Sequence, residues 1–95
     1  MREDEVQRAS RIFNALGNET RFKILLLISE TQRPLHIKAV AKALDMDYAA
    51  LYRHVKVLQR SNLLEVYEVG RSRVLSLKNR ELTEKIIEVA NKIIQ

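Results

Sequence analysis

The helical hydrophobic period of this 95-residue chain returns over residues 80–94 after one interruption, which begins after Asn62. Before that residue, apolar side chains recur every three or four positions, which is the spacing of amphipathic helices. After it, residues 64–69 alternate and are rich in β-branched and aromatic side chains, which is typical of a strand. A turn at Gly70-Arg71-Ser72 and a second strand over 73–77 complete a predicted hairpin. The fold must therefore join a group of helices to a single two-stranded ribbon.

Five helices are predicted around this hairpin, over residues 5–16, 19–29, 36–44, 48–60 and 80–94. Gly17 is expected to take a left-handed conformation that ends the first helix, and Asn62 to end the fourth in the same way. Asn18, Asp47 and Asn79 have the side chains that cap helix N-termini, so each is expected to start the helix that follows it.

The predicted order is α-α-α-α-β-β-α, within a single domain over residues 1–95. The helix over 19–29 is apolar nearly all round and should form the buried centre. The helices over 36–44 and 48–60 are joined by a tight connection and followed by the ribbon. This arrangement predicts a winged helix-turn-helix, a mainly α fold with a small β-hairpin.

The net charge of +5 is concentrated in the middle of the chain. Residues 31–78 carry nine Lys and Arg against four Asp and Glu, whereas 1–30 and 79–95 are each balanced. A basic segment between neutral ends favours contact with nucleic acid. A solubilising surface would account for the charge alone equally well.

Helix 48–60 divides into two faces on a helical wheel. Leu51, Val55 and Leu58 cluster on the face expected to pack on the core. The opposite face carries cations, a tyrosine and a small residue: Ala49, Tyr52, Arg53, Lys56 and Arg60. Such a face suits insertion into a major groove, although an ordinary solvated basic face is the alternative.

Each side chain on that outward face has a role it could play on DNA. Arg53 can bond guanine bidentately, Tyr52 can reach a base edge or a phosphate, and Ala49 permits close approach or contacts a thymine methyl. Lys56 and Arg60 lie further along the helix and are expected to meet phosphates.

Three further positions near this helix and the hairpin tip are candidates. Tyr48 either touches DNA or closes the turn onto the preceding helix. Arg71 and Arg73 flank the hairpin tip and are expected to enter a minor groove or bind phosphate, unless they serve only to keep the hairpin soluble. His54 lies beside the core stripe, where we favour a packed, hydrogen-bonded histidine over a base contact.

Helix 80–94 carries two neighbouring apolar stripes, formed by Leu82, Ile86, Val89 and Ile93 and by Ile87, Ala90 and Ile94. One stripe can pack on its own domain. A second exposed stripe is costly unless a partner covers it, which predicts a homodimer. A thicker monomer core around this helix is the alternative.

Three stretches of the chain resemble the ArsR-type winged-helix repressors, a family named for arsenic resistance. They are residues 15–25 (ALGNETRFKIL), the pair 39–44 (AVAKAL) and 51–58 (LYRHVKVL), and residues 63–66 (LLEV) leading to Gly70-Arg71. The resemblance spans most of residues 11–77. It implies a homodimer built largely from helices 5–16 and 80–94, with helix 48–60 reading DNA.

The sequence departs from the metal-sensing members of that family. Those members carry a Cys pair on the third helix, where this chain has His36 and Lys38, and it contains no cysteine at all. Other members place His and acidic ligands on the last helix, which here has acids but no His. No metal and no cofactor is therefore expected.

The sequence as a whole predicts a sequence-specific regulator of transcription that binds double-stranded DNA. We expect a homodimeric repressor on a palindromic site, with helix 48–60 in the major groove and the wing, residues 67–74, on the backbone or in the minor groove. The alternatives are a non-specific, chromatin-like DNA-binding protein and a winged helix that binds other proteins.

Other classes of protein are disfavoured. The chain has no Gly-rich phosphate loop and no Ser/His/Asp constellation, so it is not expected to be an enzyme. It has neither an apolar run of membrane-spanning length nor a secretory signal, which predicts a cytoplasmic protein without a membrane partner. No effector ligand is assigned.

Overall fold

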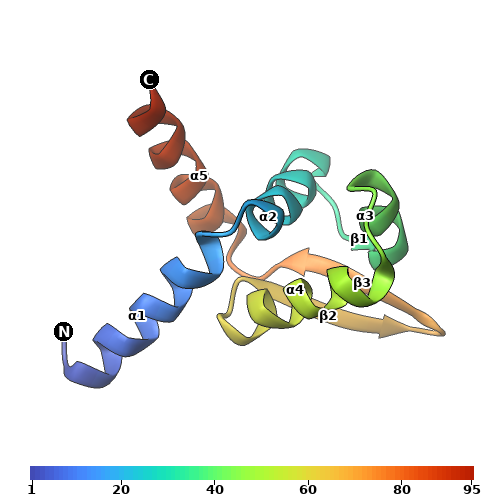
Figure 1. Cartoon of the computed structure of the whole chain (residues 1–95), viewed down its shortest axis with the longest axis horizontal. Coiled ribbons are helices and arrows are strands. Elements are labelled where there is room, and N and C mark those ends of the chain that lie inside the picture. The colour runs from blue at the N-terminus through green and yellow to red at the C-terminus, as the bar shows by residue number, and fades with distance from the viewer.

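Five helices and a three-stranded antiparallel sheet make up the fold in the computed structural model, which describes all residues 1–95 (Figure 1). The elements are α1 (Glu3–Leu16), α2 (Glu19–Thr31), β1 (Leu35–His36), α3 (Ile37–Ala43), α4 (Tyr48–Arg60), β2 (Leu64–Val69), β3 (Ser72–Leu77) and α5 (Arg80–Ile94). The predicted winged helix-turn-helix is confirmed. The predicted bounds hold for α4, β2 and α5, and those of the other elements shift by one or two residues.

The sheet contains one strand more than the hairpin that the sequence predicts. β2 and β3 pair in antiparallel register from Leu64 with Leu77 to Val69 with Ser72, around a turn in which Gly70 has φ 62°. β1 adds to the other edge of β3, where His36 pairs with Val74. His36 is therefore extended rather than helical, and the predicted start of the third helix is wrong by one residue.

Two of the three predicted N-caps are confirmed. The Asn18 side chain accepts a hydrogen bond from the backbone N of Arg21 at 3.0 Å, and Asp47 accepts one from Ala50 at 3.3 Å. Asn79 does stand at the N-cap position of α5, but its side chain makes no capping hydrogen bond, so that prediction is correct in position only. Its ψ of 72° departs from the extended 128° and 139° of the two residues whose side chains do cap a helix.

The prediction for Asn62 is confirmed and that for Gly17 is wrong. Asn62 has φ 63°, the left-handed conformation that follows α4. Gly17 has φ −80°, and its N–H continues the helical pattern by bonding to the Phe13 carbonyl at 2.9 Å. The last carbonyls of α1 are bonded instead by the guanidinium of Arg21, so no left-handed residue is needed there.

The core lies between α2, the inner faces of α3 and α4, and the sheet. Its members are Ala15, Ile24, Leu25, Ile28, Ile37, Val40, Ala41, Leu51, Val55, Leu58, Leu63, Leu64, Leu75 and Leu77. The prediction that α2 forms the buried centre holds for Ile24, Leu25 and Ile28, which are completely buried. Leu26 and Leu27 remain half-buried, so α2 is not enclosed on every side.

The helices α1 and α5 extend from this core at the end of the molecule opposite the wing tip (Figure 1). α1 buries only Ala15 and α5 buries only Thr83. Large apolar side chains are left exposed on both helices, with Phe13 68% exposed and Ile93 77% exposed. None of the helices combines the length and the apolar character that crossing a bilayer requires.

Candidate nucleic-acid interface

A tight turn joins α3 to α4. Asp45 takes a left-handed φ of 52°, and the N–H of Met46 bonds back to the Ala41 carbonyl at 2.9 Å. Asp47 then caps α4, so only four residues separate the two helices. Left-handed backbone is tolerated best by Gly, Asn and Asp, which explains an aspartate at this position. The result is a helix-turn-helix with a fixed angle between its helices.

The packing of α4 sets which of its faces meets the solvent. Leu51, Val55 and Leu58 are completely buried against the core. The opposite face therefore points outward, with Ala49 and Arg53 exposed. Arg53 makes no hydrogen bond or ion pair within the molecule, so its five N–H donors are available to a partner.

Tyr48, Tyr52 and Lys56 form a row along one side of that face. The two tyrosine rings stack with centroids 6.3 Å apart, and the Lys56 Nζ lies 5.7 Å from the Tyr52 centroid. Tyr52 and Lys56 are half-buried. The predicted outward placement holds for them only in part, because neither side chain is fully exposed.

Arg73 is engaged inside the molecule. Its Nη1 donates to the Tyr48 Oη at 2.9 Å, its Cζ lies 4.5 Å from the centroid of the Tyr52 ring, and its Nε pairs with Glu68 at 3.4 Å. The hydrogen bond to Tyr48 raises the pKa of Arg73 above its usual value. We call Tyr48, Tyr52 and Arg73 the tyrosine–arginine cluster; sequence reasoning missed it.

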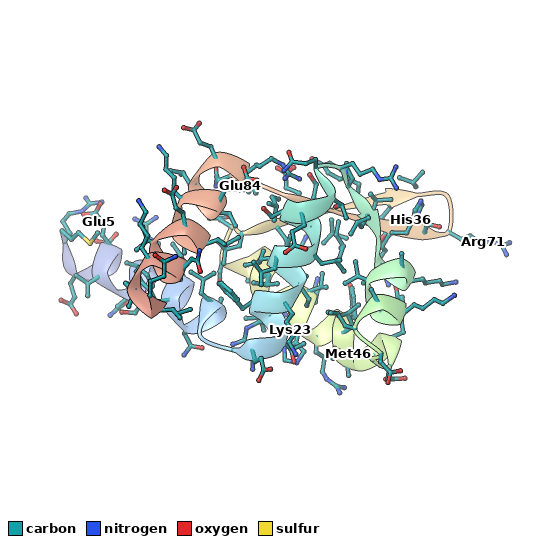
Figure 2. The ribbon with its side chains drawn as sticks, turned by 90° about the horizontal axis from the view of Figure 1, so that it is seen from above. Glu5, Lys23, His36, Met46, Arg71 and Glu84 are labelled. Carbon is teal, nitrogen blue, oxygen red and sulfur yellow. The ribbon has the colours of Figure 1, made fainter.

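Arg71 lies at the tip of the wing and points away from the body of the molecule (Figure 2). It is exposed and makes no hydrogen bond or ion pair. Beneath the tip, a cavity of about 280 Å³ is lined by His36, Ile37, Lys38, Tyr48, Arg71, Ser72 and Arg73. No acidic side chain lines this cavity; of its cations, Arg73 is paired with Glu68, whereas Lys38 and Arg71 have no acidic partner.

Arg60 is exposed but stands apart from the cluster. It lines an open cavity of about 490 Å³ between α1 and α4, together with Ser10, Arg11, Asn14, Ala15, Val57 and Ser61. Neither Arg11 nor Arg60 has an acidic partner. Arg11 was not a candidate from the sequence, because nothing in the pattern of α1 indicates that it lies beside α4.

His54 is a packed, hydrogen-bonded histidine, as favoured from the sequence. Its Nδ1 lies 3.3 Å from the Nη1 of Arg21. Because a guanidinium only donates, Nδ1 must accept, and the neutral ring carries its proton on Nε2. Burial, followed by the charges of Arg21 and Arg53, holds the pKa of His54 below its ordinary value.

This lowered pKa predicts a loss of stability in mild acid. The unfolded chain takes up a proton on this imidazole more readily than the folded one. The unfolding free energy should therefore fall as the pH drops from about 7 through the ordinary histidine pKa toward the lower value of folded His54. Urea titrations of the wild type and His54→Gln at several pH values measure this, and the variant should lose part of the dependence. His36→Gln removes the other, exposed imidazole and should retain it; equal behaviour of the two variants would contradict the assignment.

Nothing in the structure offers a metal site. No three His, Asp or Glu side chains lie together in an arrangement that could hold an ion. The acidic residues of α5 are instead paired with neighbouring cations, such as Glu81 with Lys85 at 3.3 Å and Glu88 with Lys92 at 3.2 Å.

The sequence pattern of the helix-turn-helix domain family matches residues 16–67, from the end of α1 into β2. The chain belongs to the helix-turn-helix domain family. The matched segment contains the turn between α3 and α4 and the whole of α4. No curated protein matches the sequence.

Solved structures place this helix-turn-helix protein in a more specific fold. HlyU from Vibrio cholerae N16961 superposes with a TM-score of 0.80 at 21% identity, over 99% of this chain and 100% of that one. NolR from Sinorhizobium fredii superposes with a TM-score of 0.82 at 21% identity, over 95% of this chain and 87% of that one. Mb0332 from Mycobacterium bovis superposes with a TM-score of 0.85 at 21% identity, over 96% of this chain and 85% of that one. Mb0332 is described as a homodimeric winged helix-turn-helix DNA-binding domain and a possible ArsR-family transcriptional regulator. These likenesses confirm the winged-helix fold, and with it the fold that the ArsR-type resemblance implied.

Proposed function

We propose that this helix-turn-helix protein is a regulator of transcription that binds double-stranded DNA sequence-specifically as a homodimer. The observation that carries the proposal is the orientation of α4. Its apolar face is completely buried, and its opposite face exposes Ala49 and the unpaired Arg53. An α-helix with that face free fits the width of a major groove.

Within the groove, each candidate residue has a distinct task. Arg53 reads guanine through two hydrogen bonds, while Ala49 lets the helix approach the base edges. Tyr52 reaches a base edge or a phosphate beside it. Lys56 and Arg60 neutralise phosphates further along the helix, and Arg71 carries the contact to the next stretch of backbone or minor groove. Tyr48, the first residue of α4, lies beside Tyr52 on the same side of the helix.

The homodimer is argued from the surface of α1 and α5. Phe13, Leu82, Ile86 and Val89 line an apolar groove of about 420 Å³ together with Lys85. Phe13, Leu82 and Val89 are each more than half exposed, which is unfavourable for a free monomer. Mb0332, which has the same fold, is homodimeric. A two-fold dimer presents two copies of α4 and therefore reads a palindromic site, and it would repress by covering a promoter that contains this site.

Selection of bound duplexes from a random DNA pool, carried out at two salt concentrations, tests this function. A palindromic sequence that is still enriched at the higher salt supports it. Binding of all duplexes with a steep salt dependence would instead indicate a non-specific coating protein. Absence of any DNA binding would indicate a protein-interaction module.

Arg53→Ala should weaken binding to the selected site by roughly 1–3 kcal/mol, about 5- to 150-fold, and relax the preference at one base pair of each half-site. The reason is the loss of a bidentate contact to a base. The affinities of Arg53→Ala and Arg71→Ala for matched and mismatched duplexes are measured side by side. Arg71→Ala should weaken binding to every sequence evenly. Wild-type binding by both variants would disprove the assignment of the site.

A further inference from the structure

Arg73 joins the wing to the first turns of α4. It belongs to β3, yet its guanidinium donates to Tyr48 at 2.9 Å and stacks on Tyr52 with its Cζ 4.5 Å from the ring centroid. The two tyrosines stack on each other at 6.3 Å with their planes 16° apart. One side chain of the wing thus holds two side chains of the helix that faces DNA.

The neighbouring arginine of the wing is a direct contrast. Arg71, two residues earlier, is exposed at the tip and has no partner. Arg73 has only 33% of its side chain exposed, and its Nε pairs with Glu68 at 3.4 Å while its Nη1 is bonded to Tyr48. To bind a phosphate, Arg73 would have to give up contacts with Tyr48, Tyr52 or Glu68. Arg71 would give up nothing.

The cluster has a geometry that only arginine and tyrosine together supply. The planar guanidinium offers an N–H edge to the Tyr48 hydroxyl and a flat face to the Tyr52 ring at the same time. A lysine ammonium keeps the charge but cannot present both. The position of the wing relative to α4 therefore depends on this pair of contacts as well as on the strand pairing.

We propose that Arg73 is a positioning residue, which fixes the angle between the wing and α4 through Tyr48 and Tyr52 and thereby sets how sharply α4 discriminates between DNA sequences. This inference rests on the proposed function and deepens it. Backbone contacts from the wing determine where α4 sits in the groove, and base readout requires that position to be held to within about 0.5 Å.

The first test needs no DNA. Arg73→Lys, Tyr48→Phe and the double variant are melted at one fixed protein concentration. Each single variant should lower Tm by about 2–5 °C, and the double variant should fall little below the lower single, because both substitutions break the same contact. Arg71→Gln is the matched control in the wing and should leave Tm unchanged. Additive shifts, or none, would overturn the proposal.

The second test measures DNA binding at several salt concentrations. Arg73→Lys and Tyr48→Phe should each lower the ratio of affinities for the selected and a random duplex by about three- to tenfold, with the salt dependence unchanged. Arg71→Gln should do the reverse. The slope of log affinity against log salt concentration should fall by about one unit, while the ratio of affinities for the selected and the random duplex is preserved. If Arg73→Gln loses a unit of slope while Tyr48→Phe binds as wild type does, Arg73 is a phosphate contact and the proposal fails.

The two tests separate this inference from the proposed function. If the wild type shows no preference for any duplex, the proposed function fails. The melting experiment then still decides whether the cluster couples the wing to α4. If the wild type prefers the selected duplex and Tyr48→Phe leaves that preference unchanged, the proposed function stands and the positioning role of Arg73 is rejected.

Discussion

Replacing Val89 with Asp should convert the proposed homodimer into a monomer and weaken its binding to the proposed palindromic site by about 10²-fold or more, because two linked half-site contacts become one. Val89 is 55% exposed and lies in the apolar groove beside Phe13 and Leu82. In the free chain a carboxylate there meets water, so the fold should survive. In a dimer the same carboxylate would be buried among the apolar side chains of this groove, which costs several kcal/mol and weakens the association.

Sedimentation velocity and titration of a full palindrome against a single half-site measure this outcome. The variant should sediment as a monomer and bind the half-site as the wild type does. Lys92→Glu places a negative charge on the polar face of the same helix, where the side chain is 71% exposed, and should remain dimeric. A Val89→Asp protein that still forms a dimer would exclude this face as the interface.

Arg21→Ala should cost about 2–4 kcal/mol of unfolding free energy, because three hydrogen bonds are lost with one side chain. Arg21 bonds the Ala15 carbonyl at 2.7 Å through Nε and the Asn14 carbonyl at 3.1 Å through Nη2. Its Nη1 lies 3.3 Å from His54. Its removal leaves the last turn of α1 without a cap and a half-buried imidazole without its donor.

Urea unfolding at fixed protein concentration measures the loss. Arg21→Lys should recover only a small part of it, since one ammonium cannot reach three acceptors arranged around a planar fork. Arg8→Ala is the control, because Arg8 makes only an exposed pair with Asp4 at 3.4 Å and should cost no more than about 0.5 kcal/mol. Equal losses of unfolding free energy for Arg21→Ala and Arg8→Ala would show that the three hydrogen bonds of Arg21 stabilise the fold no more than one exposed ion pair does.

The features that follow local rules were predictable from the sequence. The buried stripe of α4 follows from the 3.6-residue period of Leu51, Val55 and Leu58, and its start follows from the cap at Asp47. The strand β1 was not predictable, because two residues carry no alternation and their extended state depends on pairing with β3. Gly17 was misassigned for a similar reason: a side chain from the next helix satisfies the carbonyls that a left-handed residue would otherwise serve.

Some residues of the candidate site were likewise predictable from the sequence, and others become apparent only in the fold. The wheel of α4 was sufficient to identify Arg53 as an outward cation. It could not distinguish Arg71 from Arg73, which differ by two positions on one hairpin. Only the fold shows that Arg73 reaches Tyr48 while Arg71 is free at the tip. Arg11 was overlooked because its place beside Arg60 depends on how α1 crosses α4.

The placement of α1 and α5 at one end of the molecule and of the wing at the other determines the length of DNA that a pair of chains could cover. The longest dimension of one chain is 41 Å. Joined through α1 and α5, two chains would hold their Arg71 side chains at opposite ends of the pair and no more than about twice 41 Å apart, which corresponds to at most about 24 base pairs at 3.4 Å each. Two such regulators would therefore compete for neighbouring operators less than about two helical turns apart, so operator spacing would itself decide whether a promoter can be occupied twice.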